Sequence, residues 1–132
     1  MNATIDRTEE LTRGVDASHR KVCSAQRELL ARIAQVDREK AWKDSGARDV
    51  AHWLKMRLGI SHWKAGRWIA AAHALESLPR ISKALSSGEL GMDKVVELTR
   101  FASPETEGDL LRWAKQVSCG AIRHKGDLSS RS

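Results

Sequence analysis

The residues whose types could support chemistry crowd into one stretch of the chain, positions 49–75. This stretch reads DVAHWLKMRLGISHWKAGRWIAAAHAL and holds three of the five tryptophans and three of the five histidines. Aromatic rings interleaved with basic side chains are typical of nucleic-acid binding, whereas clustered histidines are typical of a metal site. A third interpretation is an aromatic core with a solvated rim, so the spacing of the residues has to decide.

The histidine spacing argues against a metal site. His52, His62 and His73 are ten and eleven residues apart, whereas metal-binding histidines on one helix usually lie three or four residues apart or accompany a CxxC pair. The sequence therefore predicts no metal ion and no cofactor.

Catalytic motifs are equally hard to find. The sequence has no GxSxG nucleophile motif and no glycine-rich phosphate loop. The carboxylates of SPETEGD, positions 103–109, fit the capping of a helix N-terminus. We expect no catalytic residue and no enzyme activity in this chain.

The charge distribution favours a polyanionic partner. The chain carries a net charge of +6, and residues 48–80 contribute six basic groups against only Asp49 and Glu76. A local basic excess favours nucleic acid, although a solubilising face would carry the same charges. Both interpretations stay open from composition alone.

Helical periodicity narrows the candidate site to a few residues. A helix over 50–58, a turn containing Gly59, and a helix from 62 follow the helix-turn-helix plan. On a helical wheel the second helix places Ala65, Trp68, Ile69, Ala72 and Leu75 on its core face. The candidate nucleic-acid-binding residues are Lys55, Ser61, Trp63, Lys64 and Arg67. Trp63 has two interpretations, an exposed ring that contacts nucleic acid or a ring packed under another helix.

The rest of the chain also reads as helix, and we predict an all-α fold, a single helical bundle of about six helices. A first helix over 15–42 carries an apolar stripe with charged residues opposite it. This stripe is Val15, Val22, Leu29, Ile33 and Val36. Further helices are expected over 62–77, from Pro79, over 92–102, and from Ser103 onward. The expected domain is 15–125, between a flexible N-terminus (1–14) and a flexible tail (126–132).

The composition also bounds the compartment. No apolar run approaches the roughly 20 residues that a membrane span requires, and the N-terminus MNATIDRTEELTRG resembles neither a signal nor a transit peptide. We expect a cytoplasmic protein with no membrane partner, in which Cys23 and Cys119 are reduced thiols.

The order of these motifs is similar to that of a known bacterial family. Positions 53–98 contain a WL helix, an LG-S turn, a helix ending in alanines and leucine, the Leu78-Pro79 pair and an AL-x-x-GEL segment. In this order they resemble domain of unknown function 222, also called the 13E12 repeat family, over about residues 16–120. Members of that family often place this helical region before a C-terminal HNH nuclease domain, so the resemblance implies a role beside a nuclease.

The sequence departs from that arrangement after its helical region, since no HNH-like motif follows before Ser132. A fragment of a longer nuclease and a stand-alone domain are both consistent with this ending. We therefore expect a non-catalytic domain that binds DNA or assists an HNH-type endonuclease. The expected partners of such a domain are DNA and a nuclease domain. The alternative is a protein-interaction module, favoured by the long first helix, that self-associates into a homo-oligomer and does not bind nucleic acid.

Overall fold

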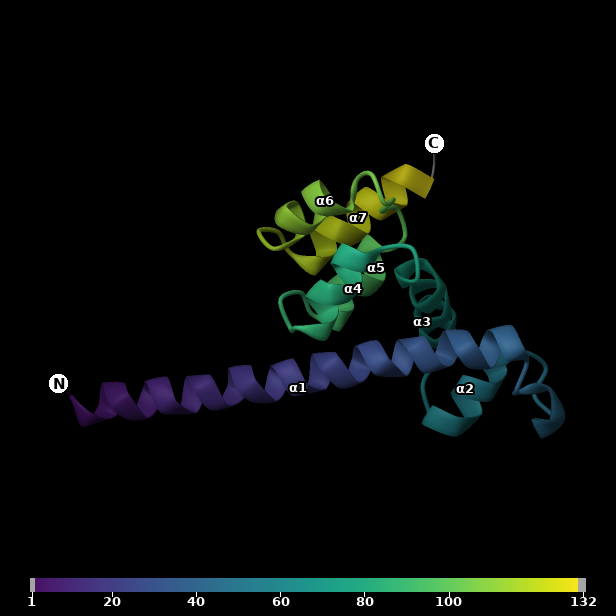
Figure 1. The fold of residues 1–132 in the computed structure, drawn as a ribbon, viewed down its shortest axis with the longest axis horizontal. Coiled ribbons are helices and arrows are strands. Elements are labelled where there is room, and N and C mark those ends of the chain that lie inside the picture. Colours follow the sequence, from purple (N-terminus) through teal and green to yellow (C-terminus); the bar gives the residue numbers. More distant parts are fainter. Residues whose placement is uncertain (1, 131–132) are drawn as a thin grey trace.

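A computed structural model describes residues 2–130, and the regular elements within them are helical (Figure 1). This confirms the all-α prediction, with one α-helix more than the six expected. In chain order the elements are α1 (Ala3–Glu39), the 3-10 helix η1 (Lys43–Ser45), α2 (Val50–Leu58), α3 (His62–Leu75), α4 (Pro79–Ser86), α5 (Met92–Leu98), α6 (Glu107–Ala114) and α7 (Cys119–Ser130).

The first helix begins earlier than the sequence pattern predicts, at Ala3 rather than near Val15. Asn2 caps it, since its side chain accepts a hydrogen bond from the Thr4 N–H at 2.9 Å. Residues 3–14 include strong helix formers such as Glu, Leu and Arg and no proline, so the charge-rich composition that suggested a flexible terminus equally suits an exposed helix. The expected helix start was wrong for this reason.

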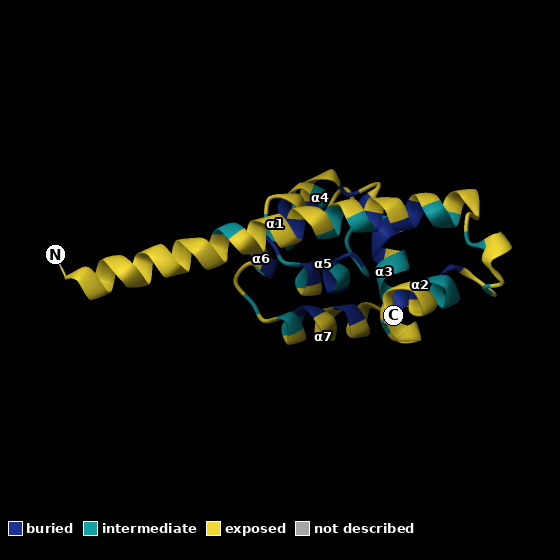
Figure 2. Cartoon of the chain, turned by 90° about the horizontal axis from the view of Figure 1, so that it is seen from below, coloured by how far each residue is buried: buried dark blue, intermediate teal, exposed yellow. Residues whose placement is uncertain are grey.

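The buried side of α1 also differs from the predicted stripe. Val15 and Val22 are exposed, Leu29 and Val36 are half-buried, and of the stripe only Ile33 is buried. The residues of α1 that enter the core are Cys23, Leu30, Ile33 and Ala34. Only the C-terminal half of α1 therefore packs on the rest of the domain, while its N-terminal half projects away from it (Figures 1 and 2).

The middle of the chain follows the local sequence signals closely. The predicted helix over 50–58 is confirmed at both ends, and α3 ends at Leu75, two residues before the expected end. Pro79 occupies the first turn of α4 as predicted. α5 is shorter than expected and ends at Leu98 rather than Ala102.

Two predictions near the C-terminus were wrong. α6 begins at Glu107 rather than just after Ser103, because the intervening residues form a turn in which the Ser103 carbonyl accepts the Thr106 N–H at 3.0 Å. Residues of the expected tail lie in α7, which the sequence reading missed. Residues 131 and 132, the end of that tail, lie outside the described part of the chain.

α3 lies at the centre of the packing and contacts α1, α2, α4 and α5. Its buried face is built from small residues, Ala65, Ala71 and Ala72, together with Leu75. Small side chains allow neighbouring helices to approach closely. The core around them is completed by Leu54, Leu78, Ile81, Leu85, Val95, Leu98 and Ile122.

Two close contacts hold α1 against α4 and against the turn that follows α4. The Arg27 side chain donates to Ser82 on α4 at 2.5 Å, and a Cβ on Gly88 would meet the Arg20 Cγ at 2.8 Å. Gly88 also has a φ of +79°, a conformation that favours glycine. The turn after α4 can therefore lie directly on α1 only with glycine at this position.

A buried carboxylate joins α6 to α4. Glu107 is only 3% exposed, and its Oε2 accepts hydrogen bonds from the backbone N–H groups of Arg80 and Ile81, each at 3.1 Å. These donors belong to the first turn of α4, where Leu78 provides no side-chain cap. A residue from another helix thus satisfies the N-terminus of α4.

No helix between residues 2 and 130 is both long enough and apolar enough to cross a bilayer. Cys23 and Cys119 are free thiols, as expected. Burial raises the pKa of the Cys23 thiol, which lies 3.4 Å from the His19 Nε2.

We expect Glu107→Ala to lower the free energy of unfolding by about 2–3 kcal/mol, because it leaves two N–H groups without a partner at a part-buried helix start. Urea unfolding followed by circular dichroism measures this. The matched control is Glu105→Ala in the turn that precedes α6, at an exposed residue, which should stay within about 0.5 kcal/mol of the wild type. Equal effects of the two changes would contradict the capping role.

A second stability prediction concerns pH. The hydrogen bond from Arg38 on α1 holds the pKa of Glu76, next to the end of α3, below its usual value of 4.5. A carboxylate whose pKa is lower in the folded state stabilises the fold at pH values above its unfolded-state pKa. This stabilisation is lost as the pH falls through the folded-state pKa.

We therefore expect Glu76→Gln to be less stable than the wild type at pH 7, with the difference shrinking below about pH 4.5 as the wild-type carboxyl becomes protonated. Thermal unfolding across this pH range provides the measurement. Glu28→Gln is the control, because its ion pair with Arg32 lies within a single helix. A gap that is independent of pH would contradict the role of the Glu76 charge.

Candidate nucleic-acid interface

The turn between α2 and α3 is defined by residues that the local sequence rules predict. Asp49 caps α2 by accepting the His52 N–H at 2.8 Å. Gly59 ends that helix with a φ of 69°, and its N–H donates to the Lys55 carbonyl at 3.0 Å. Ser61 then caps α3, since its Oγ accepts the Lys64 N–H at 3.0 Å. These contacts fix the direction in which α3 leaves the turn.

The two sides of α3 divide as the helical wheel predicts. Ala65, Ala72 and Leu75 are buried, and Trp68 and Ile69 are half-buried against the core. The opposite side carries exposed or half-buried residues, namely Trp63, Lys64, Gly66, Arg67 and Ala70. Packing of the inner face of α3 against the core therefore fixes the direction in which its outer face points.

Trp63 is 64% exposed, which excludes the alternative that its ring packs under another helix. The Arg67 guanidinium, one helical turn along, lies over its ring at 4.9 Å from the centroid. A cation held over an aromatic face is attracted to the ring and also restricts its rotamers. The pair therefore presents a partly ordered aromatic and cationic surface to solvent.

Two further pairs of this kind flank the first. Lys64 lies 5.6 Å from the centroid of Trp68, and Arg57 on α2 lies 4.8 Å from the centroid of Trp53. All three tryptophans of the 49–75 stretch are thus each covered by a cation. Trp68 is half-buried against the core, as predicted, and Trp53 is half-buried against it as well, so that of the three only Trp63 is largely free of the core.

The structure brings four of the five predicted site residues together and places the fifth at the edge. Ser61, Trp63, Lys64 and Arg67 all belong to the cap or the first two turns of α3. Lys55 is exposed on the last turn of α2, on the other side of the turn. The Ser61 Oγ accepts the capping bond, and its hydroxyl proton can still donate to an anion.

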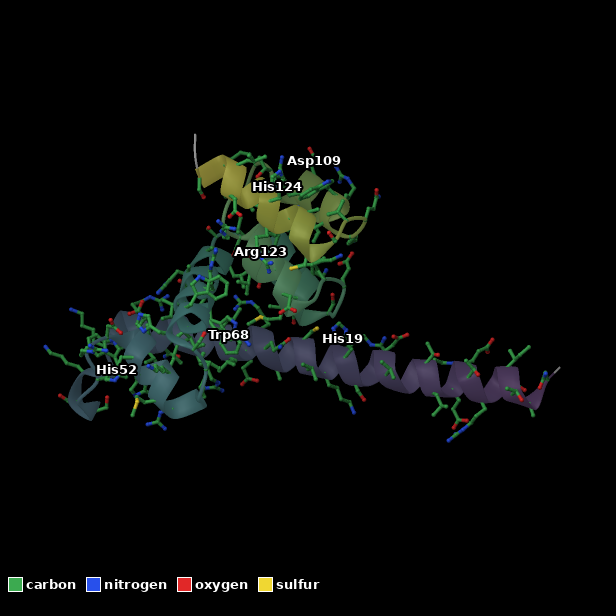
Figure 3. The ribbon with its side chains drawn as sticks, turned by 180° about the vertical axis from the view of Figure 1, so that it is seen from behind. His19, His52, Trp68, Asp109, Arg123 and His124 are labelled. Atoms are coloured by element: carbon green, nitrogen blue, oxygen red, sulfur yellow. The ribbon has the colours of Figure 1, made fainter. Side chains whose placement is uncertain are left out.

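Sequence reasoning missed the contribution of α7 to this surface. Arg123 on α7 lines a small cavity of about 90 Å³ together with Lys64, Arg67 and the two tryptophans of α3. Two of these side chains, Arg123 and Trp68, are labelled in Figure 3. It was missed because residues from 126 were assigned to a flexible tail and no helix was assigned to the segment before them. The available sequence signal for a helix start was Ser118, a residue type that often caps helices. In the structure its Oγ accepts the Ala121 N–H at 3.1 Å.

Acidic groups border the same cavity. Glu97 on α5 is 3% exposed, and it accepts a hydrogen bond from the Arg123 Nε at 3.0 Å. This bond raises the pKa of Arg123. Arg100 lies 3.7 Å from the other Glu97 oxygen. The buried carboxylate is therefore compensated by two guanidinium groups, and it fixes Arg123 beside α3.

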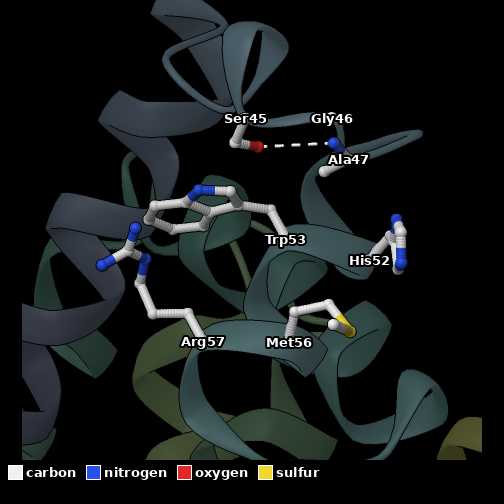
Figure 4. A pocket seen from close by; sticks show the side chains of 7 residues that line it. All are labelled: Ser45, Gly46, Ala47, His52, Trp53, Met56 and Arg57. Atoms are coloured by element: carbon white, nitrogen blue, oxygen red, sulfur yellow. Dashed lines mark hydrogen bonds between the residues drawn. The ribbon is translucent and has the colours of Figure 1, made fainter.

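A second hollow lies at the start of α2, lined by residues of η1 and α2 (Figure 4). Its cavity volume is about 470 Å³, and its walls include Trp53, Arg57 and His52. Met56, at its rim, is 72% exposed. This hollow gives α2 an aromatic and a basic side chain of its own beside η1.

The histidines of the stretch take separate roles. His52 Nδ1 accepts the Arg48 N–H at 3.1 Å, whereas His73 Nε2 contacts Asp37 Oδ2 on α1 at 2.6 Å. Among residues 2–130, no group of three His, Cys, Asp or Glu side chains is arranged to hold a metal ion.

Comparison with known protein families identifies a match over nearly the whole chain. The family described as domain of unknown function (DUF222) matches residues 9–131. Neither the comparison with curated proteins nor the comparison with solved structures gives a match. The match covers the α2–α3 surface and the whole core.

The turn makes a stability prediction with an internal control. Gly59→Ala should lower the free energy of unfolding by about 1 kcal/mol, because alanine is strained at a φ of +69°. Gly66→Ala should raise it by about 0.5–1 kcal/mol, because Gly66 lies within a helix and its Cβ would meet open space. Thermal unfolding of the two variants measures the pair. The same sign for both would contradict the assigned turn.

Proposed function

The chain belongs to the DUF222 family, a domain of unknown function, and from its surfaces we propose that it is a non-catalytic DNA-binding domain. The observation that carries the proposal is the exposed Trp63 with Arg67 over its ring at the capped start of α3. Aromatic faces can stack on bases or sugars, and the cations beside them can contact phosphates.

The arrangement of α2 and α3 supports a helix-turn-helix-like mode of binding. The first turn of α3 carries free backbone N–H groups beside Lys64, and a helix N-terminus with a cation is favourable for a phosphate. Lys55 and Arg57 lie on the preceding helix and would extend the phosphate contacts to the other side of the turn. Arg123 would add a contact from α7.

An association with an HNH-type endonuclease is the second part of this proposal. It rests on the resemblance to family members that place such a helical region before an HNH domain. In that role this domain would hold DNA, and the residues that cut it would belong to the nuclease part.

Binding of a labelled DNA duplex at two salt concentrations tests the proposal. The double variant Lys64→Ala plus Arg67→Ala should bind about tenfold or more weakly, and the slope of log K against log salt should fall by about two, since two phosphate contacts are lost. Trp63→Ala should also weaken binding, by about 1 kcal/mol or more.

The matched control is Arg13→Ala plus Arg32→Ala, which removes the same charge from exposed positions of α1. It should retain most of the affinity. The proposal is wrong if the wild type shows no binding at low salt, or if the α3 and α1 double variants lose affinity equally.

A further inference from the structure

The first four turns of α1, residues 3–17, lack a packing partner within residues 2–130. We call residues 3–22 the α1 overhang. At 1.5 Å per residue, residues 3–17 extend about 22 Å beyond the body, whereas Arg20 lies against Gly88 of the turn after α4. The ribbon of the overhang is almost entirely exposed (Figure 2). Four large apolar side chains lie on it with more than half of their surface exposed. They are Ile5, Leu11, Val15 and Val22.

The overhang is nevertheless amphipathic. On a helical wheel its charged residues fall within one half of the circumference; these are Asp6, Arg7, Glu9, Glu10, Arg13, Asp16, Arg20 and Lys21. The other half holds the four apolar residues with threonine, serine and histidine, and a shallow groove runs along Leu11, Val15 and Val22. A helix gains most of its stability by packing such a face against a partner, so we expect this face to be covered.

The spacing of the face identifies its occupant. Thr8, Val15 and Val22 recur every seven residues, and Leu11 and Ser18 lie at the two intervening d-type positions. β-branched residues at the a positions with leucine at d favour two parallel strands. We propose that a second copy of this chain covers the α1 overhang, in a parallel two-stranded coiled coil.

The flanking charges select the parallel orientation. In a parallel pair Arg7 faces Thr12 of the second copy and Lys21 faces Gln26, so no like charges meet. In an antiparallel pair over the same span, Arg7 would face Lys21 of the second copy twice. Only the parallel orientation therefore avoids contacts between like charges along the overhang.

The position of the body also permits this pairing. α4 contacts α1 through Arg27, which donates to Ser82 and lies about a third of a turn around the helix from the Val15 and Val22 face. The turn after α4 reaches only the rim of that face, where Val22 lines a hollow with Leu90. A twofold axis along the helix pair would carry the second body to the opposite side. Leu29, the next residue in the seven-residue series, stays half-buried at the edge of the body, so the seam can continue past the overhang.

Sedimentation equilibrium of the full chain tests the pairing. The mass should rise with concentration from 14.7 kDa to twice that value. Leu11→Asp plus Val15→Asp should remain monomeric at all concentrations. The control Ser24→Asp plus Ala31→Asp adds the same charge to exposed positions on the opposite side of α1 and should dimerise like the wild type. A wild type that is monomeric throughout, or a Leu11 and Val15 variant that still dimerises, would overturn the proposal.

Cross-linking tests the orientation. Thr8→Cys in a Cys119→Ser background places one accessible thiol on the overhang, because Cys23 is buried. In a parallel dimer the two thiols lie side by side, and oxidised glutathione should convert them to an intermolecular disulfide while it is reduced to two thiols. In the antiparallel pair they would lie about 15 Å apart along the axis, beyond the Cα separation of about 7 Å that a disulfide allows. A dimer that does not cross-link would overturn the parallel arrangement.

Discussion

Close packing around α3 is the constraint on which the rest of this structure depends. Ala65, Ala71 and Ala72 are essentially inaccessible to solvent, and they let α1, α2 and α5 approach one short helix from different sides. Any larger side chain at these positions would separate helices that share a single core, because protein interiors tolerate little added volume. The long α1 is held in place mainly by α3 and α4, and by polar contacts such as those of Arg27 and Glu76.

The same constraint shapes the candidate interface. Since the inner face of α3 admits only small residues and leucine, its large aromatic and basic residues have to lie on the outer face or at its border. Trp68 lies at the border, packed against the core, and Trp63 lies beyond it in solvent. The capped turn then determines where Lys64 and Arg67 point, so the surface that we propose for DNA follows from how the core is filled.

Local signals were sufficient to predict α2, the Gly59 turn and the start of α3, because these depend on residues close together in the sequence. α7 was missed because the residues that it buries, Ile122 and Gly126, include a single large apolar side chain, which is too little to show a helical period. Because α7 was not predicted, the role of Arg123 on that helix was not predicted either. The cap of α4 by Glu107 was equally invisible, because its donors lie 26 and 27 residues away in sequence. Tertiary contacts of this kind cannot be derived from periodicity.

The sequence pattern correctly predicts an apolar face on α1, but this face is not the one that packs on the rest of the domain. The stripe through Val15, Val22 and Leu29 is present, but the body packs on a different side of α1, around Cys23 and Leu30. A single sequence specifies that a face is apolar and leaves open which surface covers it. Because α1 is continuous from the overhang to its contact with α3, the overhang and the α2–α3 surface are held at a fixed separation and share no residue. Substitutions can therefore separate a role in association from a role in nucleic-acid binding.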